Sequence, residues 1–132
     1  MATIKRFEDI GAWQEGRKLV RAIYQASCAG NFARDFALRD QIRRAAISIP
    51  SNIAEGFERD GNREFYQFLS LAKGSCGEVR TQLYLALDEA YVTKSQFDSL
   101  SEAALRISRM VASLMTYLRR SGMRGPKFKN EP

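Results

Sequence analysis

Apolar residues recur at three- and four-residue intervals along four long segments of this 132-residue chain. That spacing matches the turn of an α-helix, and no segment alternates polar and apolar residues as a half-buried strand does. The segments cover about residues 9–29, 35–56, 62–90 and 93–121. Long helices joined by short turns pack best as a bundle, so the sequence predicts an all-α, antiparallel up-down four-helix bundle.

Helix-capping residues mark the ends of these segments. Asp35 and Asn62 stand where N-caps are expected, and Gly56 is expected just beyond the end of the second helix. Thr93 followed by Gln96 matches a capping box at the start of the fourth helix. We therefore expect residues 1–121 to form the bundle and residues 122–132 to form a flexible basic tail.

The first segment is expected to end at Gly30 and Asn31, because glycine and asparagine commonly follow a helix. Trp13 and Tyr24 fall on or beside its apolar positions, which favours packing in the core. The predicted core face of this helix comprises Ile10, Trp13, Val20, Ile23, Tyr24 and Ser27.

Pro50 lies inside the second segment, where it removes a backbone donor and clashes with the preceding turn. The helix must therefore kink or split there, and the apolar pattern continues to Ile53, which favours a kink. Ser48, Ser51 and Asn52 could bind the backbone groups that Pro50 frees.

Gly74 and Gly77 lie in the middle of the third segment, and each costs about 1 kcal/mol relative to alanine in a helix. Glycines in such a place suggest a close helix crossing. We place that crossing against the predicted kink at Pro50 as a hypothesis.

The chain contains no histidine. That excludes Ser-His and Cys-His catalysis, histidine-ligated zinc and the Glu-x-x-His di-iron motif. Cys28 and Cys76 cannot form a four-ligand zinc site; a single disulfide is possible, but reduced thiols fit a cytosolic chain better. We therefore expect no enzyme activity, no metal and no cofactor.

The chain has a net charge of +6, and residues 93–132 hold eight basic residues against three acidic ones. Clustered basic residues can neutralise phosphates, although they can also form an ordinary solvated face. Arg39 and Arg44 each follow an aspartate by four residues, a spacing that pairs such charges on a helix. The candidate nucleic-acid-binding residues are Arg106, Arg109, Arg119, Arg120, Arg124, Lys127 and Lys129, with a second cluster at Arg17, Lys18 and Arg21.

A second face of the third segment mixes aromatic and basic side chains. Such a face could be a subunit interface, a base-stacking surface or a partly buried side of the bundle. Its candidate interface residues are Tyr66, Arg80, Tyr84 and Tyr91.

Three strings of the sequence resemble a known family. Residues 44–56, RAAISIPSNIAEG, resemble the signature R-A-x-x-S-I-x-x-N-I-A-E-G of the 23S rRNA intervening-sequence proteins. Residues 72–78, AKGSCGE, resemble that family's A-x-G-S-x-x-E, and residues 7–13 resemble its start. The family is similar in turn to the accessory variability determinant of diversity-generating retroelements.

The resemblance implies an up-down bundle that assembles into a ring-shaped homopentamer with a basic surface and no catalytic activity. It further implies nucleic acid as a partner, with a reverse transcriptase as another candidate. Residues 31–36 lack the proline expected from the family before the second helix. The motif residues, which we interpret as structural, are Arg44, Ser48, Pro50, Asn52, Glu55, Gly74, Gly77 and Glu78.

Two hypotheses for function follow. The first is a non-enzymatic oligomeric bundle that binds structured RNA or another nucleic acid through its basic surface. The alternative is a protein–protein assembly or adaptor module with no nucleic-acid role. No apolar run approaches the roughly 18 residues of a membrane helix, and the start of the chain shows no signal-peptide pattern, so we expect a cytoplasmic protein without membrane contact.

Overall fold

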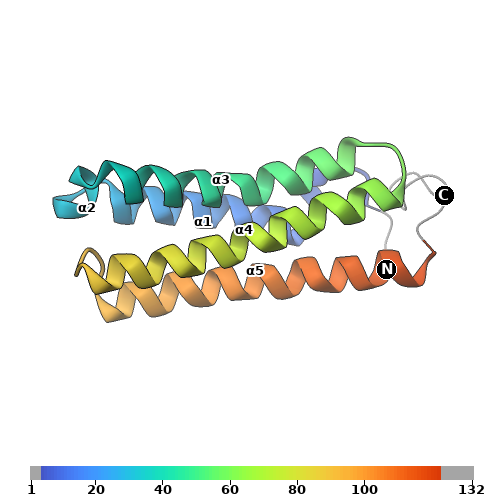
Figure 1. Ribbon diagram of the computed structural model, residues 1–132. Helices are drawn as coiled ribbons and strands as arrows, with labels where there is room; N and C mark the ends of the chain where they lie inside the picture. Colours follow the sequence, from blue (N-terminus) through green and yellow to red (C-terminus); the bar gives the residue numbers. More distant parts are fainter. Residues whose placement is uncertain (1–3, 123–132) are drawn as a thin grey trace.

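A computed structural model of the chain describes residues 4–122 and contains helices but no strand within them. The long helices lie alongside one another, as Figure 1 shows. The all-α bundle is therefore confirmed for this part of the chain, while the antiparallel order and a kink at Pro50 stay predictions. The elements are η1 (Phe7–Asp9), α1 (Gly11–Ser27), α2 (Gly30–Arg34), α3 (Phe36–Glu58), α4 (Asn62–Asp88) and α5 (Lys94–Arg120).

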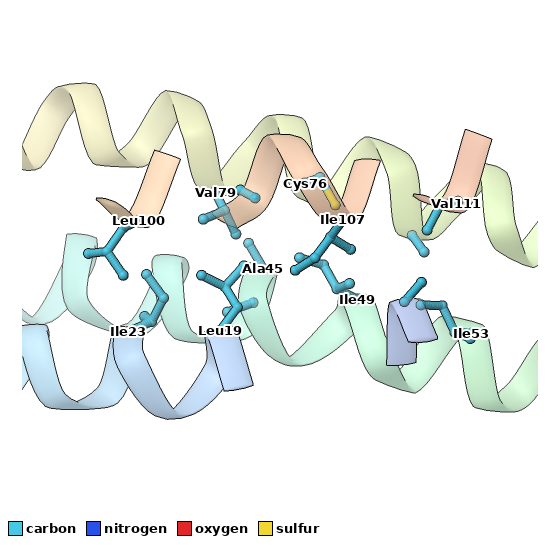
Figure 2. Packing of buried hydrophobic residues seen from close by; sticks show 14 of the residues in the cluster. Leu19, Ile23, Ala45, Ile49, Ile53, Cys76, Val79, Leu100, Ile107 and Val111 are labelled. Atoms are coloured by element: carbon cyan, nitrogen blue, oxygen red, sulfur yellow. The ribbon is translucent and has the colours of Figure 1, made fainter. Parts of the chain in front are cut away.

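Each long helix packs against two others. α3 contacts α1 and α4, and α5 contacts the same two helices from the opposite side. α1 and α4 therefore lie across the bundle from each other. Figure 2 shows the buried side chains of all four helices pointing into one shared core, among them Leu19, Ile49, Val79 and Ile107.

Two of the predicted helix starts are confirmed in atomic detail. The carboxylate of Asp35 accepts a hydrogen bond from the Leu38 amide at 3.1 Å, so Asp35 is the N-cap of α3. Thr93 and Gln96 form both hydrogen bonds of the capping box at the start of α5. These bonds satisfy amides that would otherwise lack partners in the first turns.

Two other predicted boundaries are wrong. Gly30 does not end the helical region but begins α2, and this extra turn inserts the ring of Phe32 into the core. The residue before α4 is Gly61 with φ +85°, a conformation that favours glycine. Asn62 is consequently the buried first residue of α4 and not its N-cap.

Gly56 is also not at a helix end, because α3 continues to Glu58. It is buried, and a Cβ atom added to it would lie 2.5 Å from Cβ of Phe68 and 3.2 Å from the ring of Phe65. The bare backbone of α3 therefore packs directly on phenylalanines of α4. Gly56 therefore allows α3 to pack closely on α4 and does not mark the end of the helix.

The predicted close crossing at Gly74 and Gly77 is wrong. Both glycines are exposed, and a Cβ atom added to either would meet nothing within 4 Å. The glycine that faces Pro50 is Gly16 of α1, whose added Cβ would lie 3.4 Å from Pro50 Cδ and 3.3 Å from Ile49 Cγ2. The helix that comes close to α3 at Pro50 is therefore α1 and not α4.

This close approach sets which face of α1 is buried. The buried residues of α1 are Ala12, Gly16, Leu19, Ile23 and Ser27. Trp13 and Val20 are only partly covered, and Tyr24 is 41% exposed. The predicted core face of α1 is confirmed for Ile10, Ile23 and Ser27, which are buried. It is wrong for Trp13, Val20 and Tyr24, because Ala12, Gly16 and Leu19 take the buried positions in their place.

A small polar network joins α3 to α4 inside the bundle. The hydroxyl groups of Ser48 and Ser75 hydrogen bond to each other at 2.5 Å. The Asn52 amide donates to the Ser48 carbonyl at 2.8 Å, close to the turn that Pro50 interrupts. Ser48 also donates to the Ala45 carbonyl at 2.7 Å, so these bonds reach neighbouring groups and not the Ala46 carbonyl that Pro50 leaves without its amide donor. Ser75 is the partner that the sequence pattern did not show.

Gly56 and Gly77 lie in different surroundings, so replacing each with alanine should change the stability in opposite directions. Gly56→Ala should lower the free energy of unfolding by about 1–3 kcal/mol, because its methyl group overlaps Phe68. Gly77→Ala should raise it by about 1 kcal/mol, since the new methyl group meets no atom and alanine favours the helix. Urea unfolding of both variants measures the difference, and equal effects of the two changes would contradict this packing.

Candidate nucleic-acid interface

The structure brings the two predicted basic clusters together where α1 meets α5. Lys18 Nζ lies 3.0 Å from one carboxylate oxygen of Glu15, and Arg106 Nη2 lies 3.8 Å from the other. Glu15 therefore bridges a basic residue of α1 and one of α5. Charges far apart in the sequence consequently share one side of the bundle.

The other predicted basic residues of α1 extend this surface from Lys18 across the outer face of the helix, because Arg17, Lys18 and Arg21 line one hollow. Arg17 and Arg21 are exposed on α1 and pair with no carboxylate among residues 4–122. Arg109 lies 3.5 Å from Glu102, and Arg120 follows it by 11 residues, or about three helical turns, so the two share a face of α5. We call Arg17, Lys18, Arg21, Arg106, Arg109 and Arg120 the α1–α5 basic side.

The remaining members of the first cluster are not part of this side. Arg119 donates a hydrogen bond to the Tyr66 hydroxyl and lies over its ring, 5.5 Å from the centroid. It therefore belongs to the contact between α4 and α5. Arg124, Lys127 and Lys129 lie outside the described residues.

A second surface, which the sequence did not predict, follows the contact between α1 and α3. Trp13 and Tyr24 lie on its α1 side, and each ring has an arginine over it. Arg17 lies 5.8 Å from the Trp13 centroid, and Arg43 lies 4.4 Å from the Tyr24 centroid. We call the surface the α1–α3 seam: Trp13, Arg17, Val20 and Tyr24 of α1 with Arg43, Ile47 and Pro50 of α3.

Arg43 is held in place by buried polar atoms. Its Nε donates to the Ser27 hydroxyl at 2.9 Å, and that hydroxyl donates to the Ile23 carbonyl at 2.7 Å. Ser27 is fully buried, so this bond fixes the guanidinium over Tyr24. The outer nitrogens of Arg43 pair with no carboxylate in the described part of the chain.

The acidic residues near the α1–α3 seam are engaged elsewhere. Asp40 pairs with Arg39 at 2.9 Å rather than with Arg44, which corrects the predicted pairing. Asp35 binds the Leu38 amide and the Tyr91 hydroxyl, so it does not pair with Arg39. Residues 16–34 and 41–54 contain no acidic residue, and this gap is the sequence signal that could have revealed the seam.

The mixed face of α4 lies along its contact with α5. Tyr84 packs on Phe97 with ring centroids 4.8 Å apart, and Arg80 lines a surface hollow with Asp98 and Glu102. With Tyr66 against Arg119, these residues follow one line between the two helices. A subunit interface on this face stays a prediction.

Tyr91 differs from the other tyrosines of that set because it contacts α2 and the start of α3 and not α5. Its ring stacks on Phe32 at 5.2 Å, and its hydroxyl donates to Asp35 at 2.9 Å. Hydrogen bonds from the Leu38 amide and from Tyr91 lower the pKa of Asp35. Tyr91 thereby ties the turn before α5 to the start of α3.

The other motif residues lie mainly on the outside of the bundle. Arg44, Gly74, Gly77 and Glu78 are exposed. Glu55 forms a surface ion pair with Arg59 at 2.9 Å. Within the motif strings, helices are joined by the bond between Ser48 and Ser75, by Pro50 beside Gly16 and by Gly56 against Phe68, together with the buried apolar residues.

Little in the described residues suggests other chemistry. Cys28 and Cys76 are both free thiols, and burial raises the pKa of Cys76 to about 11, which suppresses its thiolate. No cluster of acidic and cysteine side chains that could hold a metal ion occurs among residues 4–122. No helix in this range combines the length and apolar character needed to cross a membrane.

Comparisons with known proteins agree with the bundle. The sequence profile of the 23S rRNA-intervening sequence proteins matches residues 8–113. A crystal structure from Bacteroides thetaiotaomicron, a protein of unknown function from the S23 ribosomal protein family, is 22% identical with a TM-score of 0.72. That similarity covers 79% of this chain and 97% of the other and shows the fold alone. No curated protein matches the sequence.

The bond between Tyr91 and Asp35 predicts a pH-dependent effect. Tyr91→Phe removes the hydroxyl donor but keeps the ring on Phe32, so the variant should be less stable than the parent at neutral pH. Because the folded-state pKa of Asp35 is below its ordinary value of 3.8, this contribution is present above that value and disappears as pH falls through the folded-state pKa.

Urea unfolding at neutral pH and at about pH 2 measures the effect. Tyr84→Phe is the control, since the ring of Tyr84 packs on Phe97 without an aspartate partner. A stability difference for Tyr91→Phe that is unchanged in acid would show that the Asp35 bond contributes nothing.

Proposed function

The chain belongs to the 23S rRNA-intervening sequence protein family, and from this premise we propose that it is a non-enzymatic bundle that binds RNA or another nucleic acid through the α1–α5 basic side. The observation that carries the proposal is the meeting of Lys18 and Arg106 at Glu15. It joins the basic residues of two helices into one surface wide enough to contact several phosphates.

The balance of charge on that side favours a polyanion. Six basic residues share it with two acidic ones, Glu15 and Glu102. Exposed ion pairs contribute about 0–1 kcal/mol each, so phosphate groups can displace these carboxylates at little cost. Arginine presents donors that bind phosphate oxygens in pairs, and five of the six basic residues are arginines.

Assembly into a homo-oligomer, with a pentamer as the expected number, is part of this proposal. Repeated copies of a weakly binding basic side would act together on one nucleic acid and increase its affinity. The proposal also includes an antiparallel order of the helices and a kink at Pro50. It further includes a reverse transcriptase as another partner.

A protein–protein adaptor remains the second candidate because α4 carries exposed apolar residues. Leu71 and Tyr84 are each 56% exposed, and Leu85 is 48% exposed. Large exposed apolar side chains on one helix are typical of surfaces that contact another protein. This candidate uses α4, which lies across the bundle from α1.

Charge removal on α1 tests the proposal. The double variant Lys18→Ala/Arg21→Ala, which leaves Arg17 of the α1–α3 seam in place, should weaken binding of a labelled structured RNA, measured by fluorescence anisotropy over a range of salt concentrations. If both side chains contact phosphates, the slope of log K against log salt should become smaller by about 1.4–1.8.

The matched control is Arg63→Ala/Lys73→Ala, which removes the same charge from exposed positions on α4. Its salt slope should change clearly less than that of the α1 variant. Equal losses for the two variants would mean that only net charge matters, and absence of binding by the parent protein at low salt would exclude the proposed function.

A further inference from the structure

We infer that the α1–α3 seam stacks the unpaired bases of single-stranded nucleic acid on Trp13 and Tyr24, with Arg17 and Arg43 binding the adjoining phosphates. The inference rests on the proposed function and narrows it from nucleic acid in general to single-stranded segments. It assigns a binding role to two aromatic residues that the bundle core does not fully bury.

The two rings are suitably placed for one strand. Trp13 and Tyr24 are separated by 11 residues, which is about three helical turns and about 16 Å along one face of α1. Between them the partly covered Val20 and the exposed Ile47 give the seam an apolar floor. A strand that follows α1 can therefore reach both rings within a few nucleotides.

The arginines add the second requirement of a single-strand site. Single-strand-binding proteins combine aromatic platforms with basic side chains that follow the backbone. Arg43 is already fixed over Tyr24 through buried Ser27, so little side-chain freedom is lost on binding. Bases inside a duplex are stacked on each other and cannot reach the rings, which predicts a preference for single strands.

Charge distinguishes this occupant from a second copy of the chain. Arg17 and Arg43 carry the seam's positive charge, and no residue of the seam is acidic. Two copies meeting through the same face would bring these arginines against one another, which is unfavourable. A polyanion with exposed flat bases complements both the charge and the apolar floor.

Trp13 provides a direct readout because it is the only tryptophan in the chain. The probes are an oligouridine of about 12 nucleotides, within the size that single-strand sites cover, an abasic strand of equal length, and a duplex RNA. We expect oligouridine to quench Trp13 fluorescence and to bind more tightly than the abasic strand. The abasic strand, which keeps the phosphates, should leave the fluorescence almost unchanged.

Tyr24→Leu removes one ring while keeping an apolar side chain of moderate size. It should weaken oligouridine binding by a factor of about 5–150 and leave abasic binding unchanged. Tyr24→Phe keeps the ring and should bind as the parent does. Tyr84→Leu is the matched control, because Tyr84 is also an exposed tyrosine but lies where α4 meets α5.

Different results would overturn base stacking alone or the proposed nucleic-acid binding as a whole. Equal losses of oligouridine and abasic binding in Tyr24→Leu, or unchanged Trp13 fluorescence while salt-dependent RNA binding persists, would overturn stacking but keep the proposed function. Absence of binding to all three probes at low salt would overturn both. Trp13 fluorescence that changes with protein concentration alone would indicate that a second copy covers the seam, which also overturns stacking.

Discussion

The close contact of Gly16 with Pro50 determines which side chains the bundle leaves at its surface. A methyl group at position 16 would lie 3.3 Å from Ile49 and 3.4 Å from Pro50, so α1 approaches α3 with bare backbone. Small residues at 12, 16 and 27 make the buried face of α1 narrow and allow that approach. The larger Trp13 and Tyr24 consequently lie at the edge of the helix pair, where they are only partly covered.

This packing of α1 links the core to both proposed binding surfaces. On one flank of α1, Glu15 connects Lys18 to Arg106 of α5. On the other flank, Ser27 holds Arg43 of α3 over the ring of Tyr24. Arg17 lies between these flanks and can contribute to either surface. α1 is therefore the helix on which the phosphate contacts and the stacking contacts depend.

The sequence was a good guide to the helices and a poorer guide to which residues of α1 face the core. Apolar spacing and the caps at Asp35 and Thr93 located the long helices correctly, because both signals depend on neighbours in the chain. The roles of Gly16 and Gly56 depend on atoms of another helix, and no local pattern reveals such contacts. The basic residues of the α1–α5 basic side could be predicted from their clustering in the sequence. The α1–α3 seam could be found only from the structure, where Ala12, Gly16 and Leu19 are buried in place of larger residues.

Crosslinking most directly tests whether α1 carries the nucleic-acid contacts. A single-stranded RNA containing 4-thiouridine would be bound to the full-length protein, irradiated, and the crosslinked peptides identified by mass spectrometry. The structure predicts crosslinks within α1, at or beside Trp13 and Tyr24, and in the part of α3 that holds Arg43. Crosslinks confined to Tyr66 and Tyr84 on the α4–α5 side would contradict the account.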